Sequence, residues 1–532
     1  MDKETLRHVV MFSKTVDSSY SGTAEELTSE LIALSNSVSM QQPEDLASGT
    51  SYIRLRTYAG GKPAPAQVKV FSSFQNVGGS WEVLQDEVID FIRFQTDEKG
   101  EGLFPLPAGR SFLLKIDKGI IYSTVYVSIS VQAGETVDIC AKLSLLVDLK
   151  GRGIYLGDLH HHSVYSSPLH GGTDNVIDTP EDVKLSMMAS GLNYGALSDH
   201  HNILNHSEWH SLSSEDFTAI LSKEISTSGG HVAAHGVDED IIFDIPNEWQ
   251  RTDEYLRSEF IRVVDEIKKK GGLAQLNHPY TFQEATSFPE RFYDIACVFD
   301  TIEIWNGHLP FMPGFPNELA FRMWLSLLKS GCKSMAVCGS DTHKIQADDY
   351  HNFTNGLRKL CEGLTSDMCD SFKQTTDLIL ELKKHLIPAF EIWGEQTFGT
   401  GGVVNLTFVD GKPTERNLLD SLKKGKNILT NGPVLIPSIN GKYPGETAVF
   451  SGETIRLDID LVTKRVLEKL VVYTMSDEYM QVTEVCRKDG EMYNYSTNMV
   501  INVQKNDFVV LVAYGGSANL AIANPIFVAE RV

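Results

Sequence analysis

Between Gly153 and His343, short apolar runs alternate with helix-like segments, and most of the apolar runs end in His, Asp or Glu. Strands that alternate with helices are typical of α/β folds with a parallel sheet or barrel. In a parallel barrel, the carboxyl ends of all strands meet at one rim, where active sites are built. The sequence therefore predicts an α/β fold with a polar site at one rim. The side chains expected there are His160, His162, Asp199, His200, His201, Glu224, His278, Glu303, Asn306, Asp341 and His343.

The segment YLGDLHHHSVYSS places three histidines in a row behind an aspartate. Because neighbouring side chains on a strand point to opposite faces, His160 and His162 share one direction and His161 takes the other. Imidazole and carboxylate groups are ligands of Zn, Mn and Fe, and the whole set exceeds the needs of one tetrahedral ion. A carboxylate such as Glu224 can bridge two ions and hold a hydroxide between them. We therefore expect a multinuclear centre, with His161 as a support or a bystander.

Each motif of this set has an ordinary explanation when it stands alone. An HxH pair arises by chance, SDHHN can cap a helix, NHP can form a turn and GSDTH can be a loop. Their joint occurrence, in order and at strand ends, favours metal binding. The sequence has no GxSxG elbow in a strand–turn–helix context, which argues against covalent catalysis by a serine. It has no Walker loop, which argues against an activity driven by nucleotide hydrolysis.

In this order, the segments GDLHHHS, LSDHH, KEIST, NHP and GSDTH resemble the motifs of the PHP superfamily, named after bacterial polymerase and histidinol phosphatase domains. The segments IEIWNG, EISTSGGHVAAHGV, ILTNGP, INGKYPGE and AIANPIFV are similar to one branch, the carbaryl-hydrolase-like (CehA/McbA) family. The resemblance covers about residues 150–530. It implies a distorted (β/α)7 TIM-like barrel that holds two or three divalent ions of Mn, Zn or Fe.

The resemblance also implies the ligands of two ions. His160, His162, Glu224 and Asp341 would hold the first ion. Glu224 would bridge to the second, together with His278 and His231. His235, on the same strand face as His231, is a rival for its role.

His200 and His343 would face a third ion. Many PHP domains have an SDG segment after the HxH pair, and this chain has SSPLHGGTDNVIDTPED instead, where Asp174 is the candidate replacement. Glu224, Asp158 and Asp199 are the candidates for catalytic roles, the two aspartates as groups that orient the histidines.

The expected reaction is attack by a metal-bridging hydroxide on a phosphorus or carbonyl centre. The resemblance favours a phosphoesterase, and the alternative is a carboxyl or carbamate ester hydrolase. A phosphatase site usually adds Arg or Lys, but only Lys223 and Lys344 are adjacent to ligand positions, and strand alternation points Lys223 away from Glu224. A second alternative is a non-catalytic binding protein on a degenerate barrel. Four aromatic residues are candidates for an apolar leaving-group pocket or for core at the rim: Trp209, Trp249, Trp305 and Phe311.

Outside this region the pattern changes. Residues 1–45 contain one expected helix, TAEELTSELIALSNSV, and residues 46–150 show short strands with Gly and Pro turns, which predict a β-sandwich similar to prealbumin-like repeats. The barrel is expected over 151–426, with a helical insertion at 345–398. Residues 427–532 are again strand-like and predict a second β-sandwich.

The net charge of −23 argues against nucleic acid and anionic membranes as partners. No signal-like start and no apolar run of membrane-spanning length is present, and the seven cysteines are scattered without a CxxC pair. They predict reduced thiols in a cytoplasmic protein. The expected partner is a small-molecule ester substrate, and a homo-oligomer is possible.

Overall fold

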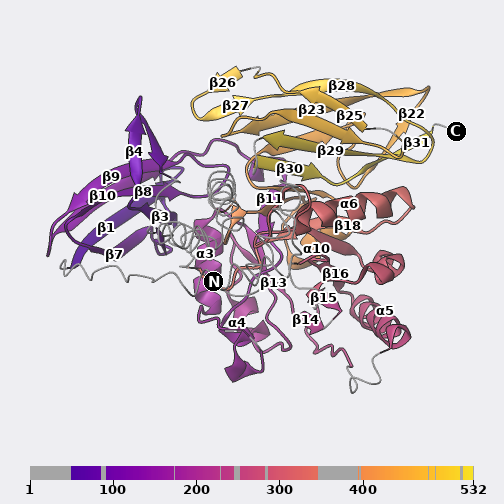
Figure 1. Ribbon diagram of the computed structural model, residues 1–532, viewed down its shortest axis with the longest axis horizontal. Helices are drawn as coiled ribbons and strands as arrows, with labels where there is room; N and C mark the ends of the chain where they lie inside the picture. Colours follow the sequence, from indigo (N-terminus) through magenta and orange to yellow (C-terminus); the bar gives the residue numbers. More distant parts are fainter. Residues whose placement is uncertain are drawn as a thin grey trace, which may run out of the picture. The chain divides into compact units, whose positions relative to one another are not determined.

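The structure is a computed structural model that describes residues 50–84, 91–172, 174–227, 229–244, 252–281, 286–345, 394, 397–476, 478–485, 487–515 and 519–530. The chain divides into two compact units, each described by itself below (Figure 1). The helix expected in residues 1–45 and nearly all of the insertion expected at 345–398 lie outside the described residues. The domain limits proposed from the sequence therefore stay predictions.

The first unit is β-rich in its described part. One sheet has β1 at its centre, parallel to β10 and antiparallel to β2 and β7, and the other has the order β6-β3-β8-β9. Residues of β1 are alternately exposed and buried, so one face of this strand is covered. Two sheets of short strands agree with the strand content expected there, and their face-to-face packing as a sandwich stays a prediction. The strands are β1 (Thr50–Ala59), β2 (Lys62–Pro63), β3 (Gln67–Phe71), β4 (Phe74–Val77), β5 (Ser80–Val83), β6 (Phe91–Gln95), β7 (Glu101–Pro107), β8 (Arg110–Asp117), β9 (Val125–Val131) and β10 (Thr136–Leu143).

The second unit contains the alternating strands and helices, and its mixed α/β class is confirmed. β11, β12 and β13 are parallel neighbours, as are β16, β17 and β18. β15 runs antiparallel to both β14 and β16, which differs from the all-parallel expectation. The strands are β11 (Ile154–Asp158), β12 (Tyr194–Leu197), β13 (Thr218–Leu221), β14 (Glu224–Thr227), β15 (Gly230–His235), β16 (Leu273–Asn277), β17 (Thr301–Asn306) and β18 (Met335–Gly339).

Helices of this unit begin at residues that cap them. Thr179 and Asp182 form a capping box before α3, and Thr252 accepts the backbone N–H of Tyr255 at the start of α5. α5 packs on β16 and α6 on β17 through apolar residues such as Phe260 and Trp324. The helices are η1 (Lys150–Arg152), η2 (Val164–Ser166), η3 (Pro168–His170), α3 (Pro180–Ala189), α4 (His206–Ser211), α5 (Asp253–Lys269), η6 (Glu290–Val298), α6 (Pro316–Lys329) and α10 (Glu415–Lys423).

The strand pairings in the described residues do not close a barrel. β11–β13 belong to one sheet and β14–β18 to another. Two isolated bridges join these sheets: His161, after β11, pairs with Thr342, after β18, and His200, after β12, pairs with Glu224, the first residue of β14. The distorted seven-stranded barrel therefore stays a prediction, but the bridges bring the strand ends with the candidate ligands together.

Buried asparagines link β18 to the neighbouring sheet. The side chain of Asn405 donates to the backbone oxygen of Cys338 at 2.7 Å and accepts its N–H at 3.2 Å. Asn524 makes the same pair of bonds with Ala336, both at 2.8 Å. Asn427 adds a bond to the Ala336 oxygen and one to Asn405, each 3.1 Å long. Side-chain amides, in place of a paired strand, thus form the hydrogen bonds of the backbone N–H and C=O groups at this edge of β18.

The carboxyl-terminal strands continue the sheet of β11. β19 pairs with β11 and with β20, and β20 pairs with β30, so one sheet runs from β13 to β25. A second sheet contains β21, β23, β26, β27 and β28, and the predicted second sandwich stays a prediction. The strands are β19 (Val404–Phe408), β20 (Asn427–Thr430), β21 (Val434–Ser438), β22 (Thr447–Phe450), β23 (Thr454–Thr463), β24 (Lys469–Tyr473), β25 (Glu478–Val482), β26 (Arg487–Asp489), β27 (Met492–Asn494), β28 (Thr497–Asn502), β29 (Asp507–Gly515), β30 (Asn519–Ala523) and β31 (Ile526–Glu530).

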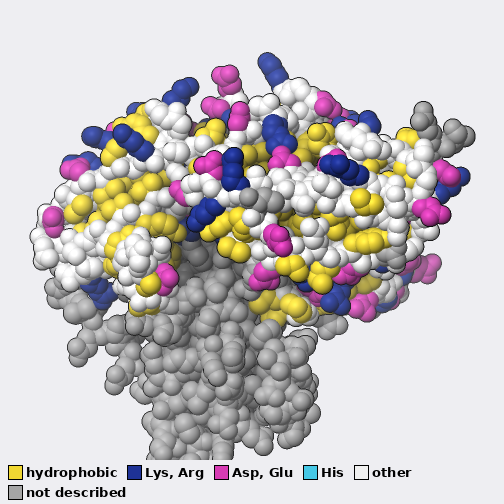
Figure 2. All heavy atoms as spheres, turned by 90° about the horizontal axis from the view of Figure 1, so that it is seen from above, with side chains coloured by type: hydrophobic (Ala, Val, Ile, Leu, Met, Phe, Trp, Pro, Cys, Tyr) yellow, Lys and Arg dark blue, Asp and Glu magenta, His cyan; other side chains and the backbone are white. Residues whose placement is uncertain are grey.

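The surface seen in Figure 2 carries hydrophobic side chains interleaved with Lys, Arg, Asp and Glu, and no histidine is visible among the described atoms of this face. Most described histidines instead lie inside the second unit. In the part of the chain that the structure describes, no helix is both long enough and apolar enough to cross a membrane.

The expectation that all cysteines are reduced is wrong for two of them. Cys297 and Cys332 form a disulfide, with Cα atoms 5.4 Å apart. Cys297 lies in η6 and Cys332 follows α6, and their separation of 35 residues in the sequence does not reveal the bridge. Cys140 and Cys338 are free thiols.

Candidate metal centre

The candidate side chains meet at a cavity of about 320 Å³ in the second unit. Strand ends and the loops that follow them supply its walls, as expected for the carboxyl rim of an α/β sheet. No Lys or Arg is among the described residues that line it. The lining consists of Asp174, His200, Glu224, His231, His278, Thr281, Thr286, Asn306, His308, Leu309, Asp341 and His343.

A first cluster lies at the floor of this cavity. The Nε2 atoms of His160 and His162 are 3.2 Å apart. Oδ1 of Asp341 lies 3.2 Å from the first and 3.1 Å from the second, and Oε2 of Glu224 lies at 3.3 and 3.5 Å. Ligand atoms about 2.0–2.2 Å from a tetrahedral ion stand about 3.3–3.6 Å from one another. The four atoms have the spacing of a ligand set around one ion.

The hydrogen bonds behind both histidines fix which ring nitrogen carries the proton. Nδ1 of His160 faces the carboxylate of Glu303 at 3.1 Å. Nδ1 of His162 lies 3.0 Å from the Ser166 hydroxyl, which gives its own proton to Asp199 and must therefore accept from the ring. Both Nε2 atoms consequently direct lone pairs at the cluster. With both rings neutral, four acceptors converge there, and either a bound cation or a proton on His160 satisfies them.

The two oxygens of Glu224 serve two different clusters. Oε2 faces His160 and His162 and also lies 3.2 Å from Nδ1 of His200, whereas Oε1 lies 3.0 Å from Nδ1 of His231 and 3.3 Å from Nε2 of His278. Glu224, His231 and His278 are close enough to hold an ion together. This is the geometry of a carboxylate that bridges two ions.

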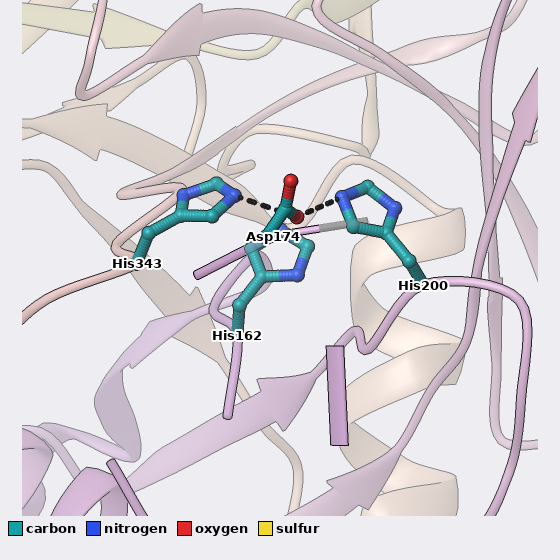
Figure 3. A group of neighbouring side chains, drawn as sticks. All are labelled: His162, Asp174, His200 and His343. Carbon is teal, nitrogen blue, oxygen red and sulfur yellow. Dashed lines mark ion pairs between the residues drawn. The ribbon is translucent and has the colours of Figure 1, made fainter. Parts of the chain in front are cut away.

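A third cluster contains Asp174, which lies between two histidines in Figure 3. Its Oδ2 atom is 2.7 Å from Nε2 of His200 and 3.2 Å from Nε2 of His343, and the ring of His162 is the fourth member. The structure thus brings Asp174 to the place where the SDG aspartate was expected. All eight ligands predicted from the sequence lie in these three clusters, and their roles as ligands stay predictions.

Two of these residues have backbone angles that side chains rarely adopt. His278 has a φ of 21° and Asp341 a φ of 55°. Such conformations cost free energy and persist where the surroundings hold them, most often at functional sites. The strained backbone of His278 and Asp341 is therefore consistent with a functional site.

The charges of the cluster favour a bound cation. Burial alone would raise the pKa of Glu224, but His160, His200 and His231 hold it well below its usual range. Burial lowers the pKa of His160, yet the neighbouring Asp341 and Glu224 carboxylates raise it well above the ordinary value. Burial and the nearby histidines hold the pKa of His162 well below its ordinary value. The carboxylates stay ionised, and positive charge is stabilised between them.

The two candidate catalytic aspartates lie behind the ligands and do not line the cavity. Asp199 accepts from the Ser163 and Ser166 hydroxyls, both at 2.7 Å, and so reaches His162 through Ser166. Asp158 accepts the backbone N–H groups of His160 and Ser340, and burial raises its pKa to about 6. These contacts orient the strand ends, and a catalytic role for either residue stays a prediction.

His161 and His235 point away from the clusters. His161 faces the Thr400 hydroxyl at 3.0 Å, and burial lowers its pKa to about 3. Nε2 of His235 lies 3.1 Å from Oε1 of Gln275. Between the two rivals on β15, the structure places His231 beside Glu224.

His235 predicts a dependence of stability on pH. Burial lowers its pKa to about 4, and an unfolded histidine titrates near 6.5. Between these values the unfolded chain binds a proton that the folded chain does not. Stability is therefore full above about pH 6.5 and falls as the pH falls to about 4, by about 3 kcal/mol. Urea unfolding across this window, in chelator, is expected to show a flatter profile for His235→Gln. Equal slopes in both proteins would refute the prediction.

The aromatic and basic candidates lie mostly outside the cavity. Trp209 and Trp305 are fully buried in the core, and Phe311 packs on Trp305 with ring centres 5.5 Å apart. Trp249 is outside the described residues. Lys223 donates to the backbone oxygen of Ile241 at 2.9 Å, away from the clusters. The rings of His308 and Phe398 stack with their centres 4.6 Å apart, His308 lines the cavity, and neither residue belongs to a motif of the sequence.

No family model matches the chain, and no curated protein matches it in sequence. One similar solved structure is a two-domain protein from Bacteroides vulgatus, described as containing a predicted PHP-like metal-dependent phosphoesterase. It is 13% identical, with a TM-score of 0.33, and the match covers 72% of this chain and 96% of that one. Others are the Bacillus anthracis TIE protein (15% identity, TM-score 0.13, 24% and 21% of the two chains) and β-glucuronidase 2 of Bacteroides uniformis (8%, 0.18, 88% and 58%). These similarities are too distant to assign a function to this chain, so the candidate site is identified from its own residues alone.

Proposed function

We propose that this chain is a metal-dependent hydrolase of the PHP superfamily, of the CehA/McbA type, and that it cleaves phosphate esters. One observation carries the proposal: the Nε2 atoms of His160 and His162 lie 3.2 Å apart, and one oxygen of Glu224 and one of Asp341 each lie within 3.5 Å of both. Such a set is unfavourable without a cation. Clustered His, Asp and Glu groups at a cavity are compatible with a multinuclear hydrolase.

Bound Mn, Zn or Fe would lower the pKa of water and stabilise negative charge on the reacting oxygens. Side chains of this protein would bind the ions and orient the ligands. Glu224 would bridge two ions, and Asp174 would hold a third with His200 and His343. Glu303 and the Asp199–Ser166 pair keep both Nε2 lone pairs of the HxH histidines directed inward.

Charge supports a phosphate ester in spite of the missing Lys and Arg. Three carboxylates face the cavity, Asp174, Glu224 and Asp341, which contribute −3. Two or three divalent ions would add +4 to +6, so the loaded site would carry +1 to +3. An anionic substrate is then attracted by the ions themselves.

The second candidate is a carboxyl or carbamate esterase. It is favoured by the absence of cationic side chains among the described lining residues and by the apolar Leu309 on one wall. A neutral ester needs no cationic partner for non-bridging oxygens. The proposal further includes the distorted barrel with flanking sandwiches, a cytoplasmic location, a small-molecule ester as the partner, no nucleic acid or membrane partner, and a possible homo-oligomer.

Metal content of the purified protein tests the proposal. We expect two or three ions per chain by elemental analysis and a lower number in His162→Ala, because this residue belongs to two clusters. His210→Ala, on the exposed face of α4, is the matched control and should keep the full content. A screen of phosphomonoesters, phosphodiesters and aryl esters then separates the two candidates. Less than one ion per chain, not restored by added Mn or Zn, would leave the binding-protein alternative.

A further inference from the structure

Glu303 lies on β17 behind the first two clusters and is fully buried. Its Oε1 atom is 3.1 Å from Nδ1 of His160, and its Oε2 atom accepts the backbone N–H of His278 at 2.9 Å. Both histidines present Nε2 to Glu224, each at 3.3 Å. One carboxylate therefore contacts two residues from different clusters on the side away from the expected ions.

Asn306 lies three residues further along the same strand. On a regular strand, residues three apart point to opposite faces. The register of β17 against β18 shifts between Glu303 and Trp305, and such a bulge turns the side chains that follow it. Nδ2 of Asn306 lies 3.3 Å from Oε2 of Glu303 and donates to Oδ2 of Asp341 at 3.0 Å. The bulge thus gives the site a second support from one strand.

We propose that Glu303 and Asn306 are positioning residues: Glu303 fixes the tautomer of His160, and Asn306 fixes the orientation of Asp341. The inference rests on the proposed metal-dependent function. A carboxylate that accepts from Nδ1–H leaves the Nε2 lone pair free for an ion. Asn306 holds Oδ2 of Asp341, so that Oδ1 faces Nε2 of His160 at 3.2 Å. The unusual backbone angle of Asp341 makes such support necessary.

Glu303→Gln changes this support with almost no change of shape. A glutamine offers one acceptor oxygen and one donor nitrogen where the carboxylate offers two acceptors. At the Oε2 position the nitrogen would face two donors, from His278 and Asn306. It therefore takes the Oε1 position, where it meets only Nδ1 of His160. That contact favours the tautomer with the proton on Nε2, the atom that faces the ions.

We expect the apparent Kd for Mn²⁺ or Zn²⁺ to rise about 10- to 100-fold in Glu303→Gln. Competition against a chromophoric chelator measures it. Because the residue positions a ligand, kcat should recover as the metal concentration is raised. Asn306→Ala is expected to show a smaller loss of affinity, about tenfold or less. Thr301→Val is the matched control, since Thr301 lies on the same strand, is fully buried, and its hydroxyl has no hydrogen-bond partner among the described residues.

Wild-type affinity in both Glu303→Gln and Asn306→Ala, with normal binding by the parent protein, overturns the inference and leaves the proposed function standing. A parent protein that binds no metal overturns both. Permanent loss of an ion in Glu303→Gln, even at saturating metal, would make Glu303 a ligand and contradict its positioning role. If that variant does not fold, Glu303→Asp keeps the charge with a shorter reach. Unchanged affinity in Glu303→Asp and Asn306→Ala would then count against the inference.

Discussion

Glu224→Gln is expected to lower kcat/KM about 10³-fold or more and to reduce the metal content of the protein. Oε2 of Glu224 faces His160, His162 and His200, whereas Oε1 faces His231 and His278. A glutamine has a single acceptor oxygen, so one cluster would meet an amide N–H in place of a ligand. Charge stabilisation by a bound ion is worth several kcal/mol, and about 4 kcal/mol corresponds to about three orders of magnitude in rate.

The measurement combines steady-state kinetics with elemental analysis. Glu254→Gln, an exposed acid at the start of α5, is the control for loss of one negative charge and should keep both rate and metal. Circular dichroism establishes that the Glu224 variant is folded. A folded Glu224→Gln protein with the parent rate and ion content would rule out Glu224 as the bridging residue.

Removal of metal is expected to lower the Tm of the metal-dependent transition by on the order of 10 °C. An ion present at 1,000 times its Kd stabilises the folded state by about 4 kcal/mol, and 1 kcal/mol shifts the Tm of a domain of ~200 residues by about 2–4 °C. The histidines and carboxylates pair with one another in the absence of an ion, so the metal-free chain is expected to stay folded at room temperature.

Differential scanning calorimetry with and without a chelator measures this shift. Adding back Mn²⁺ or Zn²⁺ should restore the Tm, and Mg²⁺ should restore it less, because imidazole ligands favour the softer ions. His162→Ala should show a smaller difference between the two states. A Tm that does not respond to chelation in the parent protein would contradict metal binding at the clusters.

Local sequence rules anticipate a large part of this site. Alternation along a strand places His160 and His162 on one side, and in the structure their Nε2 atoms are 3.2 Å apart while His161 faces Thr400. The rule that strand ends meet at one rim likewise anticipates the approach of Asp341 to these histidines. Both rules depend only on regular backbone geometry, which is why they can be applied without a structure.

Irregular geometry is what the sequence does not reveal. The bulge in β17 turns Asn306 toward Glu303, against the alternation expected of a regular strand. The antiparallel direction of β15 decides that His231, and not His235, lies beside Glu224. The bridge between Cys297 and Cys332 depends on how η6 and α6 pack. Each of these results from tertiary contacts that neither spacing nor composition encodes.

The Asn524 bonds to β18 connect the segment between β30 and β31 to the strand that precedes Asp341. Asn524 holds both backbone groups of Ala336 in β18, and Asp341 follows two residues after the end of this strand. Loss of β30 and β31 would expose the edge of β20 and remove the Asn524 bonds to β18. Such a deletion is expected to disturb the candidate site, although no described residue of the deleted segment lines the cavity.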